Sequence, residues 1–367
     1  MTTGRTAVYT AVKTIEVREY PVPEPQPGEI ILRIRQAGLC GSDLHIWRGE
    51  LGEPAPGGRP LGHEGLATVH ALGSGVDTDS LGQPLKHGER VTWFPIFTCR
   101  RCRMCLQGDL QLCLKRQVAY RMSGAEPPHF FGTFGDFFYL PPGHPIFKIP
   151  DELEDEEVVA LNCAMGTVFQ GLDSAGMRQG HNVVVMGTGG LGLYATAFAT
   201  GMGASHVIAI DRLEPRLAMA RELGATATIN IAELTTPQQR IDYVMEVTRG
   251  RGADITLELA GYGELVPEGI GMLGHQGTFV SIGNIVPGRA TTFEPRLLGG
   301  SKRMIGSTMY RPASISRMLD FIRKNRTRLP IGKVISHHFP LADIDQAFAS
   351  SEWDGQAIPV IRSVIVP

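Results

Sequence analysis

Short runs of alternating apolar and polar residues dominate the chain up to Pro150. Residues 29–35 (Glu-Ile-Ile-Leu-Arg-Ile-Arg) alternate as a half-buried strand requires, and residues 66–72 form another apolar piece of strand length. The proline-rich stretch 21–27 and many glycines separate such runs. The pattern predicts a β-rich region shaped as a small barrel, into which one cysteine-dense loop is inserted.

The pattern changes at the acidic stretch 151–157, whose carboxylates suit the positive end of a helix. Beyond His181, apolar strands are expected at 182–186, 207–210 and 278–282, and they alternate with helix-like segments such as 215–223. This alternation is typical of a doubly wound α/β sheet, which is parallel and carries helices on both faces.

After Ser307 the pattern predicts one helix at 315–325 and short strands around 337–339 and 359–364. We expect this last part to rejoin the first region. The sequence therefore predicts two domains, one of residues 1–157 and 307–367 and the other of residues 158–306.

Composition narrows the possible partners. The 367 residues exceed what one hydrophobic core usually holds, which agrees with two domains. A net charge of -2 gives no basic field for nucleic acid or an anionic membrane. The first twenty residues hold no apolar leader, and no apolar run approaches the ~18 residues of a spanning helix. We expect a cytoplasmic protein with a small-molecule partner.

Four of the six cysteines lie close together in one loop: Cys99, Cys102, Cys105 and Cys113. In a long chain of the reducing cytoplasm, cysteines so spaced are more often metal ligands than disulfides. Two-residue gaps let neighbouring thiolates converge on one tetrahedral ion, and four thiolates leave no position for a substrate. The loop is therefore predicted to hold a structural zinc ion.

A glycine-rich loop follows the strand expected at 182–186. Gly187, Gly189 and Gly192 have the G-x-G-x-x-G spacing, and a helix-like segment comes next. Backbone N–H groups at such a helix start bind pyrophosphate. The predicted cofactor-binding residues of the loop are Gly187, Gly189, Gly190, Leu191 and Gly192.

Asp211 ends the next predicted strand, where a carboxylate would bind the adenosine ribose and repel a 2′-phosphate. NAD is therefore expected as the cofactor. The neighbouring Arg212 leaves NADP open, since an arginine there accommodates that phosphate.

The two remaining cysteines, Cys40 and Cys163, are far apart in the sequence. Cys40 lies in Gly-Leu-Cys-Gly-Ser-Asp-Leu-His (38–45), and His63 lies in Gly-His-Glu-Gly (62–65). With these motifs, the four-cysteine loop and the glycine loop in this order, essentially the whole chain resembles the zinc-dependent medium-chain alcohol dehydrogenases. That resemblance implies a GroES-like β-barrel catalytic domain and a Rossmann domain.

The resemblance also implies a catalytic zinc site formed by Cys40, His63 and Cys163, and so two zinc ions per chain. Glu64 would stand close behind the metal, either exchanging onto it or forming a structural salt bridge. Asp43 would orient the imidazole of His63, or cap the helix that follows.

Three nearby residues receive roles by the same resemblance. Ser42 and His45 would relay the alcohol's proton to solvent, although a helix cap and a surface histidine are the plain alternatives. Trp47 would line the substrate pocket, unless it is part of the core. Gly41 departs from relatives that carry a basic residue there to contact the pyrophosphate.

The expected reaction is transfer of hydride between an alcohol and NAD, giving an aldehyde or ketone, because zinc stabilises the alkoxide that releases hydride readily. A sorbitol- or threonine-type dehydrogenase is the alternative, although many of those carry Glu where Cys163 stands. A zinc-free quinone or enoyl reductase and a non-catalytic structural or binding protein are two further candidates. The short segment 114–132 resembles that of tetrameric relatives, so a homotetramer is expected, with a homodimer as the alternative.

Overall fold

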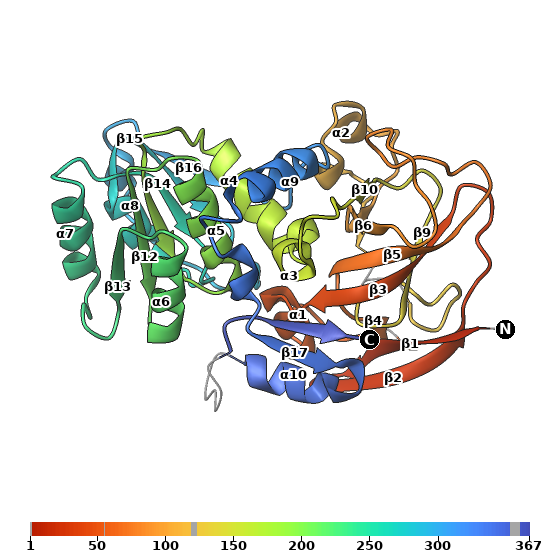
Figure 1. The fold of residues 1–367 in the computed structure, drawn as a ribbon. Helices are drawn as coiled ribbons and strands as arrows, with labels where there is room; N and C mark the ends of the chain where they lie inside the picture. Colours follow the sequence, from red (N-terminus) through yellow and green to blue (C-terminus); the bar gives the residue numbers. More distant parts are fainter. Residues whose placement is uncertain (1, 55, 119–122, 353–359) are drawn as a thin grey trace. The chain divides into compact units, whose positions relative to one another are not determined.

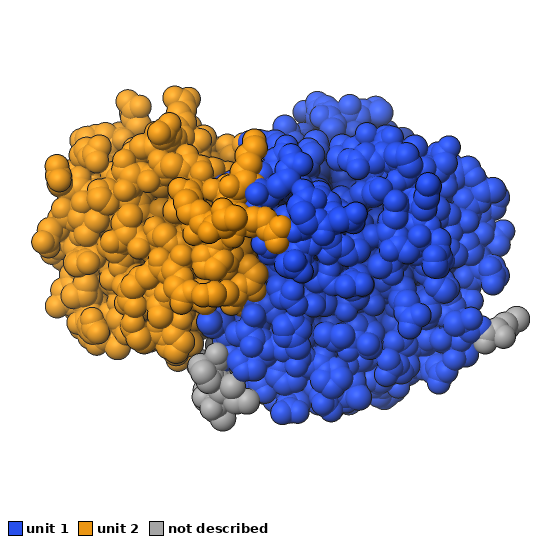
Figure 2. All heavy atoms as spheres, in the orientation of Figure 1, with its two compact units in different colours: residues 1–163, 311–323, 335–367 blue, residues 164–310, 324–334 orange. Residues whose placement is uncertain are grey.

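The computed structural model of the chain describes residues 2–54, 56–118, 123–352 and 360–367. The chain divides into unit 1 (Met1–Cys163, Arg311–Arg323 and Ile335–Pro367) and unit 2 (Ala164–Tyr310 and Lys324–Val334), drawn in two colours in Figure 2. Residues 307–310 and 324–334 thus belong to unit 2, whereas the sequence assigned them to the first domain. Residues 158–163 belong to unit 1, whereas the sequence assigned them to the second domain. Pro359 and residues 119–122, which belong to two of the segments discussed above, lie outside the described residues.

Unit 2 is built on a six-stranded parallel sheet with the strand order β13-β12-β11-β14-β15-β16 (Figure 1). Helices α5 and α6 pack on β11, β12 and β13, and α8 packs on β14 and β15. Its elements are α4 (Gly166–Ser174), β11 (Asn182–Met186), α5 (Gly190–Gly201), β12 (His206–Asp211), α6 (Glu214–Glu222), β13 (Ala227–Asn230), α7 (Pro237–Val247), β14 (Ala253–Glu258), α8 (Leu265–Gly271), β15 (Leu273–Ser281), η4 (Pro295–Leu298), β16 (Arg303–Gly306) and η5 (Ile331–Val334).

This strand order is that of the doubly wound fold, in which ligands bind where the order reverses. Here the reversal lies between β11 and β14, so the loops after Met186 and Glu258 flank the expected ligand position. The central strand β11 is buried along its whole length, which explains its uninterrupted apolar sequence. The predicted parallel α/β sheet is confirmed.

Unit 1 is mostly antiparallel. A seven-stranded sheet has the order β10-β6-β5-β3-β18-β17, with β9 also paired to β3, and a second sheet has the order β2-β1-β4. Its elements are β1 (Thr3–Ala11), β2 (Thr14–Pro21), β3 (Ile30–Gly38), α1 (Gly41–Trp47), β4 (Arg59–Pro60), β5 (Glu64–Leu72), β6 (Arg90–Trp93), β7 (Ile96–Phe97), α2 (Arg103–Leu106), η1 (Leu110–Leu112), β8 (Gln117–Val118), β9 (Phe137–Leu140), β10 (Ile146–Lys148), α3 (Asp155–Val158), β17 (His337–Pro340), η6 (Leu341–Asp343), α10 (Ile344–Ser351) and β18 (Ser363–Val366).

Two further elements extend from unit 1 into unit 2. The π-helical turn η3 (Leu161–Met165) carries Cys163, after which the chain enters unit 2. Helix α9 (Ser314–Asn325) begins in unit 1 and ends in unit 2. Single π-helical turns are frequent at functional sites, so the position of Cys163 on η3 makes it a candidate functional residue.

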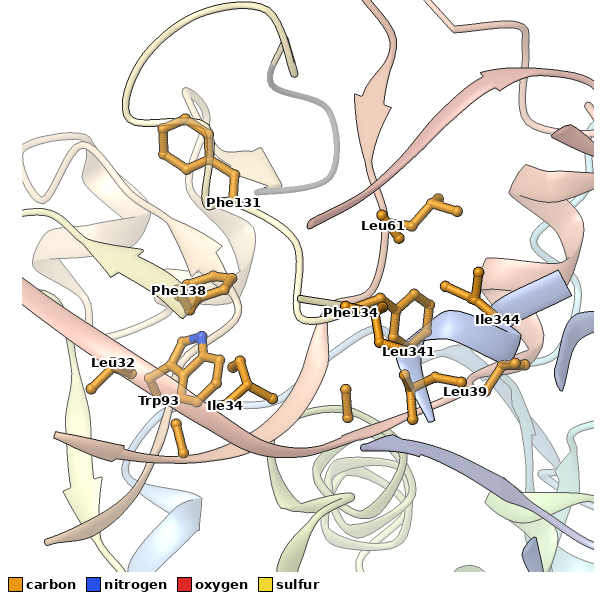
Figure 3. Close-up of a cluster of buried hydrophobic side chains, with 14 of the residues drawn as sticks. Leu32, Ile34, Leu39, Leu61, Trp93, Phe131, Phe134, Phe138, Leu341 and Ile344 are labelled. Atoms are coloured by element: carbon orange, nitrogen blue, oxygen red, sulfur yellow. The ribbon is translucent and has the colours of Figure 1, made fainter. Parts of the chain in front are cut away.

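The core of unit 1 joins segments that are distant in the sequence. Figure 3 shows Leu32 of β3 near Trp93 of β6 and Phe138 of β9, while Leu341 and Ile344 come from the C-terminal segment. Burying one such large side chain contributes about 1.5–3 kcal/mol. Together with the pairing of β18 to β3, these contacts fix the C-terminal segment against the N-terminal part of unit 1.

No helix in the described parts of the chain has the length and apolar character needed to cross a membrane.

Unit 1 buries a histidine that is neutral at pH 7. His144 is 4% exposed, and its Nε2 donates to the carbonyl oxygen of Phe94, at 2.5 Å. Burial lowers the pKa of His144 to about 4. Because the imidazole regains its ordinary pKa on unfolding, the unfolded state binds more protons between these values. The contribution of neutral His144 to the unfolding free energy is therefore complete above pH ~6.5, and it is lost as the pH falls toward 4.

We expect His144→Gln, which keeps a donor for the Phe94 carbonyl, to weaken the pH dependence of stability. Between pH 7 and pH 4 the wild type should lose about 3 kcal/mol more of its unfolding free energy than the variant. Urea unfolding at both pH values measures the difference. Identical pH dependence in the two proteins would contradict the assignment of this acid lability to His144.

Candidate metal centres and cofactor loop

Cys40, His63 and Cys163 come together in the interior of unit 1. Cys40 directly precedes α1, His63 directly precedes β5, and Cys163 lies on η3. Their ligand atoms all lie within 4.8 Å of one another. Sγ of Cys40 is 3.8 Å from Sγ of Cys163, which is 3.1 Å from Nε2 of His63. The fold thus assembles three soft donor atoms in one buried place.

Two polar side chains hold this cluster in place. Asp43 accepts a hydrogen bond from the backbone N–H of Cys40 (3.0 Å) with one oxygen, and its other oxygen lies 3.1 Å from Nδ1 of His63. Asp43 thus orients His63, as one of the two expected roles requires. It is not the N-cap of α1, which is Cys40, but it binds the N–H of that residue from the third position of the helix. Asn162, beside Cys163, accepts from the backbone N–H of Gly65 (3.0 Å), which ties η3 to the start of β5.

The three donor groups of the cluster differ in how readily they give up a proton. Hydrogen bonds with Cys163 and His63 hold the pKa of Cys40 well below that of an ordinary thiol. The bond to Cys40 and burial raise the pKa of Cys163. Burial would lower the pKa of His63, but Asp43 and Cys40 together outweigh burial and raise this pKa well above its usual value. The low pKa of Cys40 favours the thiolate that a metal requires, whereas Cys163 and His63 would release protons when an ion binds.

The donor set fits zinc. Tetrahedral zinc with bonds of about 2.3 Å to sulfur separates two ligand sulfurs by about 3.8 Å. The Sγ atoms of Cys40 and Cys163 have this separation. Three protein donors leave one position of a tetrahedron for another ligand, as in catalytic sites. No Asp or Glu of the described chain joins this group of donor atoms.

Glu64 stands outside the cluster and is paired with Arg362. Both side chains are almost completely buried, and the guanidinium donates to Oε1 of Glu64. Gly38 makes room for this carboxylate, because a Cβ at Gly38 would lie 1.8 Å from Oε1. Burial raises the pKa of Glu64, and Arg362 opposes the shift. Of the two roles that the sequence left open, the structure shows the salt bridge.

The other residues expected around the metal lie on α1. Oγ of Ser42 is 3.4 Å from Nε2 of His63, so its hydroxyl borders the cluster. His45 is buried and not a surface histidine. Trp47 belongs to the core of unit 1, where it is 7% exposed and contacts Phe348. For Trp47 the structure favours the core role over the substrate pocket that the resemblance implied.

The second cluster comprises the four cysteines of the inserted loop, which all belong to unit 1. Sγ of Cys102 lies 3.5 Å from that of Cys105, and Sγ of Cys113 lies 3.6 Å from that of Cys99. All four sulfurs are within 4.8 Å of one another. These separations again approach those of a tetrahedral zinc site, and every donor position is filled by the protein.

The backbone of this loop prepares the thiols for a metal. Hydrogen bonds from the backbone N–H groups of Cys105 and Leu114 lower the pKa of Cys102 to about 6. Burial raises the pKa of Cys105 to about 12, and hydrogen bonds to its neighbours add to the shift. A cluster that already carries one thiolate needs fewer protons removed when a cation binds.

The predicted cofactor loop joins β11 to α5 in unit 2. Gly187 adopts a φ of +94°, and a Cβ there would lie 2.9 Å from Cβ of Ala260. A Cβ on Gly192 would lie 1.9 Å from the carbonyl oxygen of Gly187, so only glycine allows this close approach of helix and strand. Helix α5 begins at Gly190 and presents the unpaired N–H groups that bind pyrophosphate.

Asp211 lies at the end of β12 and braces this loop. Its Oδ2 accepts from the backbone N–H and the hydroxyl of Thr188, at 2.7 and 2.9 Å. Its Oδ1 accepts from the backbone N–H groups of Arg212 and Leu213. The side chain of Arg212 is exposed. The carboxylate therefore stands where the sequence placed it, at the edge of the glycine loop.

Sequence reasoning missed Arg216, Arg362 and Asn162. Arg216 lies on α6, and its Nη1 is 4.0 Å from the place of a Cβ on Gly189. Burial lowers the pKa of Arg216, and Asp211 opposes this shift. The position of a basic residue one helical turn after Asp211 could have revealed it. Arg362 and Asn162 gave no comparable signal, because their partners are distant in the sequence.

Comparison with known proteins adds to this geometry. Residues 26–151 match the model of the alcohol dehydrogenase GroES-like domain, and residues 190–324 match that of a zinc-binding dehydrogenase. The chain is 35% identical over 365 residues to 5-exo-hydroxycamphor dehydrogenase from Pseudomonas putida, a match that covers 99% of each protein. It is 30% identical over 347 residues to D-xylulose reductase A from Aspergillus niger, covering 93% of this chain and 91% of the other.

Two solved structures of dehydrogenases also match this chain over its whole length. An alcohol dehydrogenase from Thermotoga maritima matches over 100% of both chains, with a TM-score of 0.90 and 27% sequence identity. A zinc-binding dehydrogenase from Sinorhizobium meliloti, solved with NADP, also matches over 100% of both chains, with a TM-score of 0.84 and 25% identity.

Proposed function

The chain belongs to the zinc-dependent medium-chain alcohol dehydrogenases, and from this premise we propose that it transfers hydride between an alcohol and NAD at a zinc ion held by Cys40, His63 and Cys163. The observation that carries the proposal is the buried convergence of these three donors. Two thiols and one imidazole are the donor set of alcohol dehydrogenase zinc sites, in which the remaining position binds the substrate. This set argues against a zinc-free reductase and against a purely structural protein.

The residues around the cluster support such chemistry. Zinc at this place would act as a Lewis acid that lowers the pKa of an alcohol's hydroxyl. Asp43 accepts the Nδ1–H of His63, so Nε2 is the nitrogen that faces the metal position. The hydroxyl of Ser42, beside Nε2, would accept the proton that the alcohol gives up while it passes its own proton on to the next member of the relay. Arg362 balances the buried charge of Glu64 behind the cluster.

We assign a second zinc ion to Cys99, Cys102, Cys105 and Cys113, which gives two ions per chain. Four cysteine donors fill the tetrahedron, so this ion would hold the loop together and take no part in the reaction. In this assignment unit 1 is the catalytic domain.

For the substrate we favour a secondary alcohol and the corresponding ketone. The two relatives named above act, by their names, on a hydroxyl of the camphor ring and on the ketose xylulose. A polyol dehydrogenase is the second candidate, favoured by the xylulose reductase relatives. Cys163 stands where many polyol dehydrogenases carry Glu. This difference favours a simple alcohol over a polyol as the substrate.

We propose NAD as the cofactor, bound through the loop of Gly187, Gly189, Gly190, Leu191 and Gly192. Asp211 beside this loop would repel a 2′-phosphate. Arg212 and Arg216 lie near it and would attract one, and the Sinorhizobium relative was solved with NADP. Since Asp211 is hydrogen-bonded to the loop backbone whereas the side chain of Arg212 is exposed, we expect NAD to be preferred.

Replacing Asp211 with alanine tests the cofactor choice. We expect the wild type to favour NAD over NADP in kcat/KM by about tenfold to a hundredfold, a free-energy difference of about 1.4–3 kcal/mol. Asp211→Ala should remove most of this preference, because the two arginines remain. Initial rates with both cofactors measure the ratio, and Asp254→Ala, in strand β14 of the same sheet, is the control. An unchanged ratio in Asp211→Ala would refute the assignment.

The proposed function is tested directly by absorbance at 340 nm. The purified protein is incubated with NAD or NADP and with a cyclic secondary alcohol, a polyol or a primary alcohol. We expect NADH formation to be fastest with the secondary alcohol. Turnover of the polyol alone would favour the second candidate, and a protein that oxidises no alcohol with either cofactor would rule out both.

We further propose a cytoplasmic location and a homotetramer. The six free cysteines suit a reducing compartment. Sedimentation at several protein concentrations would distinguish the tetramer from the alternative dimer.

A further inference from the structure

His45 cannot by itself deliver a proton to water. Its side chain is 6% exposed, and its neighbours on α1, Leu44, Ile46 and Trp47, are buried as well. The sequence offered two roles for it, a surface histidine or the last member of a relay that reaches solvent. Because the imidazole is enclosed, a proton that arrives there needs another group to carry it on.

Glu50 is the group that the fold places against this imidazole. Oε2 of Glu50 is 2.5 Å from Nδ1 of His45, and the Glu50 side chain is 28% exposed. The chain turns back after α1 through Gly49, whose φ is +77°, and the backbone N–H of Glu50 donates to the carbonyl oxygen of His45. The turn therefore fixes the carboxylate between the imidazole and the solvent.

The two carboxylate oxygens of Glu50 have different neighbours. Oε2 faces His45, whereas Oε1 lies 4.0 Å from Nη1 of Arg48. Arg48 is itself paired with Glu352 (3.1 Å), which also binds Lys13 (3.3 Å). Arg48 and Lys13 thus both pair with Glu352, whereas Oε2 of Glu50 is directed at the imidazole of His45.

We propose that Glu50 is the last member of the proton relay and passes the proton from His45 to water, an inference that rests on the proposed alcohol oxidation. When a proton arrives at Nε2 of His45, the Nδ1–H bond breaks and an O–H bond forms at Oε2 of Glu50. Water then takes this proton and restores the carboxylate. The imidazole ends neutral with its proton on Nε2. After the products leave, Nε2 gives this proton to water and Nδ1 takes one from water through Glu50, so the starting tautomer is restored with no net change in protons.

Glu50→Gln tests the relay, because an amide of nearly the same shape still accepts a hydrogen bond from His45 but cannot take its proton. We expect the rate of proton release, followed with a pH-indicator dye in a single turnover, to fall by about 10²-fold. Added acetate should restore the rate in proportion to its concentration. The variant's kcat should also become dependent on buffer concentration and should rise with pH, while zinc content and NADH binding remain those of the wild type.

Glu352→Gln is the matched control. It removes a carboxylate of similar exposure from the same group of charges and should leave proton release unchanged. Glu50→Asp, which keeps a carboxylate on a shorter side chain, should retain part of the rate and gives a second measurement if the glutamine variant is unstable.

The outcomes separate this inference from the proposed function. Proton release at the wild-type rate in Glu50→Gln overturns the relay role. A loss that acetate does not restore overturns it as well, because it would mean that Glu50 only orients His45. A wild type that oxidises no alcohol rejects the proposed function and this step together, whereas equal rates in an active wild type and Glu50→Gln reject only the step.

Discussion

Cys163→Ala is expected to lower the zinc content from two ions to one per chain and to reduce kcat/KM for alcohol oxidation by at least about 10³-fold. The substitution leaves Cys40 and His63 as the only protein donors of the proposed catalytic site, and two donors hold zinc weakly. Without the ion, several kcal/mol of transition-state charge stabilisation are lost, and each 1.36 kcal/mol corresponds to a tenfold change in rate.

Elemental analysis of protein purified without added metal, combined with absorbance at 340 nm, measures both effects. The substitution is small enough for the fold to persist, because Cys163 contributes little volume to the core. Binding of NADH, which depends on the glycine loop of unit 2, serves as the internal control and should be unchanged. Equal zinc contents in wild type and variant would mean that Cys163 is not a ligand, and the proposed mechanism would fail.

Cys105→Ala is expected to remove the other zinc ion and to destabilise the protein. The inserted loop has little apolar packing of its own: Leu106 and Leu114 are 76% and 74% exposed, and α2 has only four residues. We therefore expect its order to depend on a bound metal ion. Structural zinc binds with about 10–16 kcal/mol in small peptides, and we expect about 4 kcal/mol of this to appear in the unfolding free energy here. This corresponds to a fall in Tm of about 10 °C.

Thermal unfolding followed by circular dichroism measures the change, and trypsin reports on the loop itself. Arg101 and Arg103 are exposed within it, so cleavage there should be faster in the variant at a temperature where the rest of the chain is folded. Cys105→Ala should keep catalytic activity at low temperature, in contrast to Cys163→Ala. A variant that retains both zinc ions, or that melts with the wild type, would contradict a structural role for this cluster.

The two zinc clusters differ in how far the sequence could predict them. Cys99, Cys102, Cys105 and Cys113 lie in one loop, so their spacing alone limits how the thiols can meet. Cys40, His63 and Cys163 are brought together only by the folding of unit 1. Their predicted association depended on the resemblance to a family, because no local spacing joins residues this far apart.

Several details of the site could not be predicted because they depend on packing. The pairing of Glu64 with Arg362 joins opposite ends of the chain. The burial of Trp47 in the core follows from its contact with Phe348 of α10. The contact of Glu50 with His45 depends on the turn at Gly49, and nothing in the sequence pattern distinguished this glutamate from an exposed one.

The sequence by itself determined what short-range geometry controls: the apolar strands of the parallel sheet, the glycine loop with Asp211, and the four-cysteine loop. In each of these the spacing of residues along the chain fixes the distance between them in space. Only the tertiary structure decided which buried groups meet, from the three-residue metal cluster to the partners of Glu64 and His45 and the inclusion of residues 324–334 in unit 2. Such contacts arise from the packing of distant segments into one core, which depends on the whole chain and not on any local pattern.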